Sequence, residues 1–267
     1  MQAALFFIKV KYLSSDPAGK EAGQVWYNST TGTLRVDGII GLGTWSSGGN
    51  MNTARRGLGG AGTQAAGLAF AGYNGSDPYT RDETETWDGT CWTEVNDLNT
   101  MRNSVFSIGA TSTAAVCAAG TDLPGTPQAI CETWDGTSWT ERTSGTETDL
   151  YEVIYANSTF VVVGRPGTIL TSTDGISWTS RNSGSGTNLM GVNYGKSTFV
   201  TVGYSGTILT SSDGITWTLR TSGTTENLNG VTYGNGIFVT VGHKGNILTS
   251  SDSNTWISRT SGTSNDL

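Results

Sequence analysis

Tryptophan recurs along this chain at two fixed intervals, and the repeat limits the folds that the chain can adopt. Successive positions lie 47, 47, 39, 39 and 39 residues apart. They are Trp45, Trp92, Trp139, Trp178, Trp217 and Trp256. Periods of about 40 to 50 residues are typical of propeller blades, in which each repeat buries its apolar face against its neighbours. The spacing therefore predicts a series of similar units that are stable only together.

A tight-turn signal precedes most of these tryptophans. In one copy, residues 210–218 read Thr-Ser-Ser-Asp-Gly-Ile-Thr-Trp-Thr. Glycine accepts a positive φ, and aspartate can bond the backbone two residues on, so Asp-Gly favours a hairpin turn. The aspartates of this phrase are Asp88, Asp135, Asp174, Asp213 and Asp252. We predict that each is a turn residue and that the tryptophan anchors the next strand.

The 39-residue repeat divides into four strand-like segments. One copy has them at residues 189–194, 198–203, 207–211 and 215–218. No segment has a long helical period, and 38 glycines against 5 prolines suit many tight turns. We predict an all-β fold, a β-propeller of four-stranded antiparallel blades. Five blades are clear, and residues 1–45 supply a sixth; the alternative is five blades with residues 1–45 as an N-terminal docking arm.

The repeats divide the chain into four segments. Residues 1–45 contain a predicted strand at residues 6–12 and a hairpin of residues 24–28 and 33–37. The other segments are two long repeats in residues 46–139, three short repeats in residues 140–256 and a C-terminal tail in residues 257–267. The N-terminus has no basic leader before its apolar run, so we do not expect a signal peptide.

Several phrases resemble known families. The long repeats resemble kelch repeats, and the Ser-x-Asp-Gly-x-Ser/Thr-Trp phrase of the short repeats resembles the Asp-box motif of sialidase-like propellers, with one residue fewer between Asp and Trp. Residues 22–34 and 43–56 are similar to phrases in virion structural and tail-associated proteins of tailed bacteriophages, especially marine ones. This resemblance implies a virion component, a tail fibre or decoration protein, with other virion proteins as partners.

Composition and charge argue against several classes of function. The net charge is −7 and only 14% of the residues are charged, so we expect no nucleic-acid binding. No apolar stretch is long enough to predict membrane insertion. The three cysteines, Cys91, Cys117 and Cys131, lack motif spacing and are expected to be small apolar side chains, although a Cys117–Cys131 pair stays open.

Candidate catalytic residues are better explained by the repeat. Sialidase-like enzymes use an arginine cluster, but each arginine of the short repeats lies three residues after a tryptophan, which predicts packing over the tryptophan or bonding of a turn. They are Arg142, Arg181, Arg220 and Arg259. His243 is the only histidine, with no nucleophile motif and no cysteine or histidine at metal-ligand spacing. We expect no enzyme activity, metal or cofactor; the alternatives are a glycoside hydrolase or depolymerase and a bacterial assembly scaffold.

One position varies within a fixed frame. After the second strand of each repeat, a glycine is followed by a residue that changes from copy to copy. These residues are Tyr73, Thr121, Arg165, Tyr204 and His243. Variable aromatic and polar tips on a rigid frame suit binding of a host-surface glycan or protein. Unconstrained drift of turn residues is the alternative, and the chain can also form a homo-oligomer.

Overall fold

The computed structural model describes part of the chain in two units. The described residues are 11–13, 25–28, 33–36, 49–75, 80–103, 105–118, 120 and 129–267. They belong to two compact units, Met1–Gly48 and Gly49–Leu267, each of which we describe by itself. Among these residues, no helix is long and apolar enough to cross a membrane.

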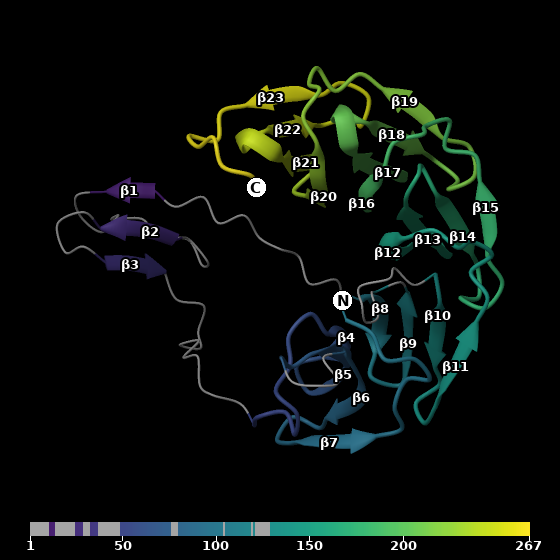
Figure 1. Cartoon of the computed structure of the whole chain (residues 1–267). Helices are drawn as coiled ribbons and strands as arrows, with labels where there is room; N and C mark the ends of the chain where they lie inside the picture. Colours follow the sequence, from purple (N-terminus) through teal and green to yellow (C-terminus); the bar gives the residue numbers. More distant parts are fainter. Residues whose placement is uncertain are drawn as a thin grey trace. The chain divides into compact units, whose positions relative to one another are not determined.

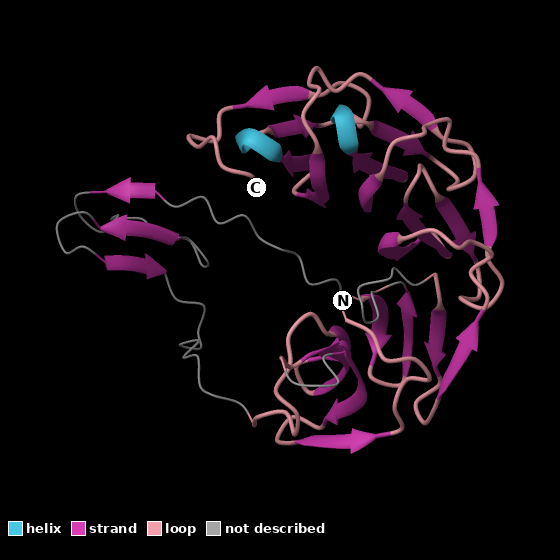
Figure 2. Ribbon diagram, viewed as in Figure 1, coloured by secondary structure: helices cyan, strands magenta, loops and turns pink. Residues whose placement is uncertain are grey.

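The larger unit consists of five four-stranded antiparallel sheets, which we number in chain order (Figures 1 and 2). The first contains β4 (Gly59–Thr63), β5 (Ala66–Tyr73), β6 (Thr80–Trp87) and β7 (Trp92–Val95). The second contains β8 (Phe106–Thr111), β9 (Ala114–Ala118), β10 (Cys131–Trp134) and β11 (Trp139–Arg142). The third contains β12 (Leu150–Ala156), β13 (Thr159–Gly164), β14 (Ile169–Ser172) and β15 (Thr179–Arg181).

The last two sheets repeat the third. The fourth contains β16 (Leu189–Gly195), β17 (Thr198–Gly203), β18 (Ile208–Ser211) and β19 (Thr218–Arg220). The fifth contains β20 (Leu228–Gly234), β21 (Ile237–Gly242), β22 (Ile247–Ser250) and β23 (Ile257–Arg259). Short 3-10 turns, η1 (Tyr204–Gly206) and η2 (His243–Gly245), follow β17 and β21. The predicted all-β class and the four antiparallel strands of each repeat are confirmed.

One predicted strand begins later than expected. The fourth strand of the short repeat was expected at residues 215–218, whereas β19 begins at Thr218. The cause is the turn before it, because Asp213 Oδ1 accepts hydrogen bonds from the N–H groups of Ile215 (2.8 Å) and Thr216 (2.9 Å). Those two N–H groups belong to the turn and cannot pair in a sheet.

The apolar core lies between consecutive sheets. Each sheet has an upstream face, turned to the preceding sheet, and a downstream face on the other side. Side chains alternate between the two faces along each strand. At the fourth junction, Val200 and Val202 on the downstream face of the fourth sheet pack against Phe238 and Leu248 on the upstream face of the fifth. The first strands β4, β8, β12, β16 and β20 also contact one another in sequence, on the inner side of this unit in Figure 1.

Two of the repeated tryptophans, Trp139 and Trp256, are buried in these junctions. The Trp139 ring contacts Phe70 of the first sheet, with 4.6 Å between ring centroids. Its indole N–H also donates to Thr84 Oγ1 over 2.9 Å. Trp256 packs in the same way with apolar residues of the fourth sheet. The prediction that the indoles join neighbouring repeats is confirmed for these two positions, and Trp45 lies outside the described residues.

The smaller unit contains three described strands. They are β1 (Lys11–Leu13), β2 (Val25–Asn28) and β3 (Thr33–Val36). β2 and β3 pair antiparallel, as the predicted hairpin requires, whereas β1 and β2 pair parallel. The predicted strand at residues 6–12 is described only from Lys11 onward. This mixed sheet differs from the antiparallel sheets of the larger unit.

The cysteines are free thiols. Cys117 lies opposite Glu132 in the β9–β10 pairing, and Cys131 lies opposite Ala118. The offset of one residue places the two side chains on opposite faces of the sheet, which explains why they do not form a disulfide. Burial raises the pKa of both thiols to about 12, so they remain protonated and act as apolar side chains. The expected role as a buried apolar side chain is confirmed for Cys117 and Cys131, whereas Cys91 is exposed and the expectation is wrong for it.

Candidate functional site

The repeated aspartates are turn residues, as predicted. In each copy Oδ1 accepts N–H bonds from the residues two and three positions on; for Asp135 these come from Thr137 and Ser138, each over 2.8 Å. In the short repeats a serine adds to the turn. Ser211 Oγ donates to Asp213 Oδ1 over 2.9 Å and accepts the Gly214 N–H over 2.8 Å. These hydrogen bonds fix the conformation of the turn, so the carboxylates have a structural role.

The hydrogen bonds also set the protonation of these carboxylates. The N–H of Ser138, with the hydroxyl and N–H of Thr137, lowers the pKa of Asp135 to about 2. The N–H groups of Thr255 and Asn254 lower that of Asp252 to about 2. A hydrogen bond to the ionised form favours that form. The aspartates are therefore ionised at neutral pH and are poor proton donors.

The repeated arginines hold their own sheets together. Nε of Arg181 donates to Thr171 Oγ1 over 2.8 Å, from β15 to the neighbouring strand β14. Arg142, Arg220 and Arg259 make the same bond to Thr133, Thr210 and Thr249, over 3.0, 2.8 and 2.8 Å. The bond joins two strands, where the sequence predicted packing over tryptophan or bonding of a turn. A repeat role is confirmed for all four arginines, and the partner is now known.

A second repeated network was not predicted. Arg102 Nη2 lies 2.6 Å from Glu132 Oε1, and both side chains are fully buried. Glu132 Oε2 also accepts the N–H of Asn99 over 2.9 Å. In the first sheet, Arg55 and Glu85 repeat the ion pair over 2.9 Å. The shared spacing of 47 residues between the two arginines and between the two glutamates was the available signal.

Three of the variable turn tips, Arg165, Tyr204 and His243, lie directly after the second strands, as predicted, whereas Tyr73 is the last residue of its second strand. Arg165 and Tyr204 are exposed and His243 is partly exposed, and Thr121 lies outside the described residues. Tyr204 N donates to the Asn188 carbonyl and His243 N to the Asn227 carbonyl, each over 2.9 Å. The backbone frame of these two tips is therefore the same while the side chain changes. Each tip belongs to its own sheet.

One asparagine also joins two sheets, and an aspartate in the tail makes an equivalent bond. Asn227, before β20, accepts the Ser205 N–H at Oδ1 over 3.0 Å, from the turn of the fourth sheet. Asp266 in the tail accepts the Lys244 N–H in the same way over 2.9 Å. The Asn227 bond holds the tip of the fourth sheet in a fixed position relative to the fifth, and the Asp266 bond attaches the tail to the tip of the fifth sheet. A side chain at a tip is thus presented by a rigid frame.

The tip of the third sheet carries charge. Arg165 forms an ion pair with Asp149, and the Arg165 side chain is half exposed. The Tyr151 hydroxyl also lies near this aspartate, 3.5 Å from Asp149 Oδ2. A break in register between Leu150 and Glu152 leaves Tyr151 as the bulged residue of β12. A β-bulge redirects a side chain, and here it accompanies a cluster of polar groups at the sheet end.

Tyr73, the tip of the first sheet, is the last residue of β5. Its N–H donates to the Arg56 carbonyl over 2.8 Å, and the Arg56 guanidinium lies 4.8 Å from the Tyr73 ring centroid. Cation–π contacts of this kind are favourable and orient the ring. The ring is partly exposed, like His243.

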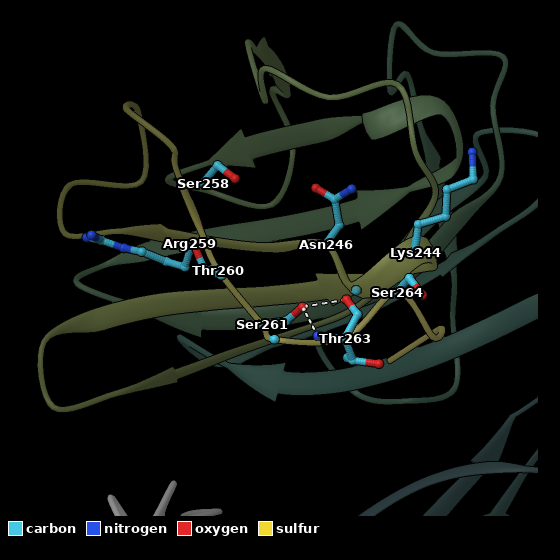
Figure 3. A pocket seen from close by; sticks show the side chains of 10 residues that line it. Lys244, Asn246, Ser258, Arg259, Thr260, Ser261, Thr263 and Ser264 are labelled. Atoms are coloured by element: carbon cyan, nitrogen blue, oxygen red, sulfur yellow. Dashed lines mark hydrogen bonds between the residues drawn. The ribbon is translucent and has the colours of Figure 1, made fainter.

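A cavity of about 590 Å³ that is widely open to solvent lies beside the tip of the fifth sheet (Figure 3). It is lined by Lys244, Gly245, Asn246, Ser258, Arg259, Thr260, Ser261, Gly262, Thr263 and Ser264. Lys244 Nζ is paired with Glu226 Oε1 over 2.9 Å. His243 Nε2 lies 4.0 Å from Asp266 Oδ2. The lining is mainly hydroxyl and amide groups, which suits a polar ligand better than an apolar one.

One partly buried carboxyl group has a shifted pKa. Burial raises the pKa of Glu152 to about 7, although its hydrogen bond from the Val192 N–H acts in the opposite direction. Glu152 lies on β12, the first strand of its sheet.

In the described part of the chain, no group of three or more His, Cys, Asp or Glu side chains could hold a metal ion. No protein-family model and no curated protein sequence matches this chain.

Proposed function

We propose that this chain is a non-enzymatic structural protein of a tailed-phage virion, a tail fibre or decoration protein. It displays a β-propeller for assembly with other virion proteins and adheres to a host-surface glycan or protein through its turn tips. It is made in the host cytoplasm and resides in the virion. The virion assignment is supported by the phrases in residues 22–34 and 43–56.

The five four-stranded sheets are the blades of this proposed propeller. Support comes from the consecutive packing of their first strands and from the tryptophan in the junctions. For residues 1–45 we favour the docking arm over the sixth blade. The reason is the parallel pairing of β1 and β2, which a blade of the predicted kind does not contain.

Adhesion is supported by one observation above all, a fixed frame with changing tips. The N–H groups of Arg165, Tyr204 and His243 donate to equivalent backbone carbonyls in their repeats. The side chains at these three positions are a guanidinium, a phenol and an imidazole. Rigid presentation lowers the entropic cost of binding. Tyrosine and histidine rings can stack on sugar rings, and the arginine can donate to hydroxyl groups.

The adhesion proposal is tested with the purified full-length chain on a glycan array and in pull-downs of host cells. A variant with Arg165→Ala, Tyr204→Ala and His243→Ala is expected to lose at least tenfold in affinity. The matched control carries Thr140→Ala, Thr179→Ala and Thr218→Ala, three exposed positions on the last strands. The control should bind like the unchanged chain. Folded chain that binds neither glycan nor cell refutes adhesion.

The virion assignment needs a separate measurement, because a virion protein need not be an adhesin. Mass spectrometry of purified particles should detect the chain at a fixed ratio to the capsid protein. Its location is then found in an electron-microscopy map of the particle. Absence of the chain from particles that are infectious and intact would refute the assignment.

A glycoside hydrolase is the second candidate, favoured only by Glu152. A group with a pKa of about 7 can act as a general acid at neutral pH. Glycosidases place a second carboxylate about 5 to 10 Å from the first. Release of reducing sugar from host polysaccharide, lost in Glu152→Gln, would support this candidate over adhesion alone.

A further inference from the structure

Within the described part of the larger unit, no other sheet covers the downstream face of the fifth sheet. Val239, Val241 and Ile247 on this face are partly exposed. Their equivalents one repeat earlier, Val200, Val202 and Ile208, have 0% exposure because the fifth sheet covers them. The same β-branched surface is thus buried in one copy of the repeat and open in the next.

Glycines on this face give the same contrast. A Cβ added at Gly195 of the fourth sheet would lie 2.2 Å from Tyr233 Cγ, because the Tyr233 ring of the fifth sheet packs directly on that glycine. At Gly234, one repeat later, a Cβ would meet no atom within 4 Å. Gly191 and Gly230 differ in the same way. The fifth sheet therefore carries the shape that receives another sheet.

The polar cavity belongs to this open side. Arg259 and Thr249 are bonded on the downstream face, and Arg259 lines the cavity together with the tail. Ser261 in the cavity is partly exposed, whereas its equivalent Ser222 is buried. The cavity occupies the place where the preceding repeat is covered. A second protein surface could therefore fill the cavity, and a small-molecule ligand is not needed to explain it.

The first sheet presents the matching surface. Its upstream face carries Trp87 and Trp92, both partly exposed, with 5.4 Å between ring centroids and 42° between planes. In the second sheet, Trp134 and Trp139 form the same pair at 5.4 Å and 43°. That pair is buried against the first sheet. The first sheet thus offers an indole pair of the type that packs on a downstream face.

We propose that the downstream face of the fifth sheet binds the upstream face of the first sheet of a second copy. Every internal junction joins a downstream face to an upstream face, and the new junction continues that series between chains. β-branched side chains and flat glycine backbone on one side meet large indoles on the other. Such a head-to-tail interface is heterologous, so the copies form a ring or an open filament.

The proposal is tested by the molar mass of the purified full-length chain between about 1 and 100 µM, the range in which interfaces of moderate affinity assemble. Light scattering after size exclusion and native mass spectrometry are the readouts. The unchanged chain should form species larger than the 28.0 kDa monomer. Val241→Asp places a charge on the downstream face and should give monomers. Leu219→Asp, at an exposed position of the last strand in the fourth sheet, should assemble normally.

Mixing variants tests the head-to-tail geometry. Trp92→Ser impairs only the upstream face, and Val241→Asp impairs only the downstream face. Each should be monomeric alone, and an equimolar mixture should form a dimer that cannot grow. The Val241→Asp variant, added to the unchanged chain, should also shorten its assemblies, because it can bind at one end but cannot bind a further copy. This experiment does not depend on the folding of the Trp92 variant. Circular dichroism verifies that each variant is folded.

Three outcomes contradict the proposal. A monomeric unchanged chain at 100 µM refutes it, and this is the result expected if residues 1–45 form a sixth blade. Dimers of Trp92→Ser alone would indicate that two downstream faces pair with each other. Assembly that is unaffected by Val241→Asp would place the interface elsewhere.

Discussion

Glu152 Oε2 accepts a hydrogen bond of 2.6 Å from the backbone N–H of Val192, so a carboxyl group of the third sheet is bonded to the fourth sheet. A glycine beside the contact leaves room for the carboxyl group. A Cβ at Gly191 would lie 3.2 Å from the same oxygen. A titratable group thus takes part in the junction between two sheets, and the stability of that junction depends on pH.

Stability is expected to fall as pH rises from about 4.5 to 7. The folded pKa of Glu152, about 7, is above the ordinary value of 4.5, so the unfolded chain loses this proton first. Ionisation therefore favours unfolding within that window and has no further effect above it. The loss is about 1–3 kcal/mol. Urea unfolding at pH 5 and pH 8 measures it, and Glu152→Gln should remove this part of the pH dependence. An unchanged pH profile in the variant would contradict the assignment.

Removal of one partner of the buried ion pair should be strongly destabilising. Arg102→Ala leaves the Glu132 carboxylate buried without its guanidinium, at an expected cost of about 3–5 kcal/mol. Chemical unfolding of the single variants and of Arg102→Met with Glu132→Leu completes the test. The double variant should be more stable than either Arg102→Met or Glu132→Leu alone, because no unpaired charge remains. Strictly additive effects would show that the pair is not coupled.

The Asp-Gly turn should depend on the aspartate oxygen. Asp213→Ala removes the acceptor of two N–H bonds and should lower the melting temperature by about 2–4 °C. Asp213→Asn keeps an acceptor and should lose less. The N–H bonds of Thr216 and Ile215 lower the folded pKa of Asp213 below its ordinary 3.8, so this stabilisation is present above pH 3.8 and is lost as the pH falls further. Equal melting of both variants would contradict the role of the oxygen.

Two equivalent glycines should differ in their tolerance of a methyl group. Gly195→Ala forces a Cβ into the Tyr233 ring and should cost about 1–3 kcal/mol. Gly234→Ala, 39 residues later, has free space and should change stability by no more than about 0.5 kcal/mol. Thermal unfolding of the two variants in dilute solution makes the comparison. A large effect at Gly234 would mean that its face is covered even in the monomer.

The local features of the repeat could be predicted from sequence because they depend on neighbours in the chain. Asp-Gly dictates a tight turn, and alternation of β-branched residues favours strands on either side of it. The turn at Asp213 and the strand β17 follow from such local preferences. The variable tips were found for the same reason, since the glycine before each one holds a constant place. The late start of β19 also has a local cause, because the N–H groups of Ile215 and Thr216 bond to Asp213 in the turn and are not free to pair with the neighbouring strand.

Tertiary structure alone decided which side chains meet across the sheets. Arg102 meets Glu132 across 30 residues within one repeat, and Glu152 meets Val192 across 40 residues and between two sheets, so neither contact follows from local sequence. Burial then changes their chemistry, because the pKa of a carboxyl group depends on the solvent that packing removes. The repeat length determined that similar units would follow one another. Which faces those units bury, and which face of the fifth sheet remains open, is a property of their packing in space.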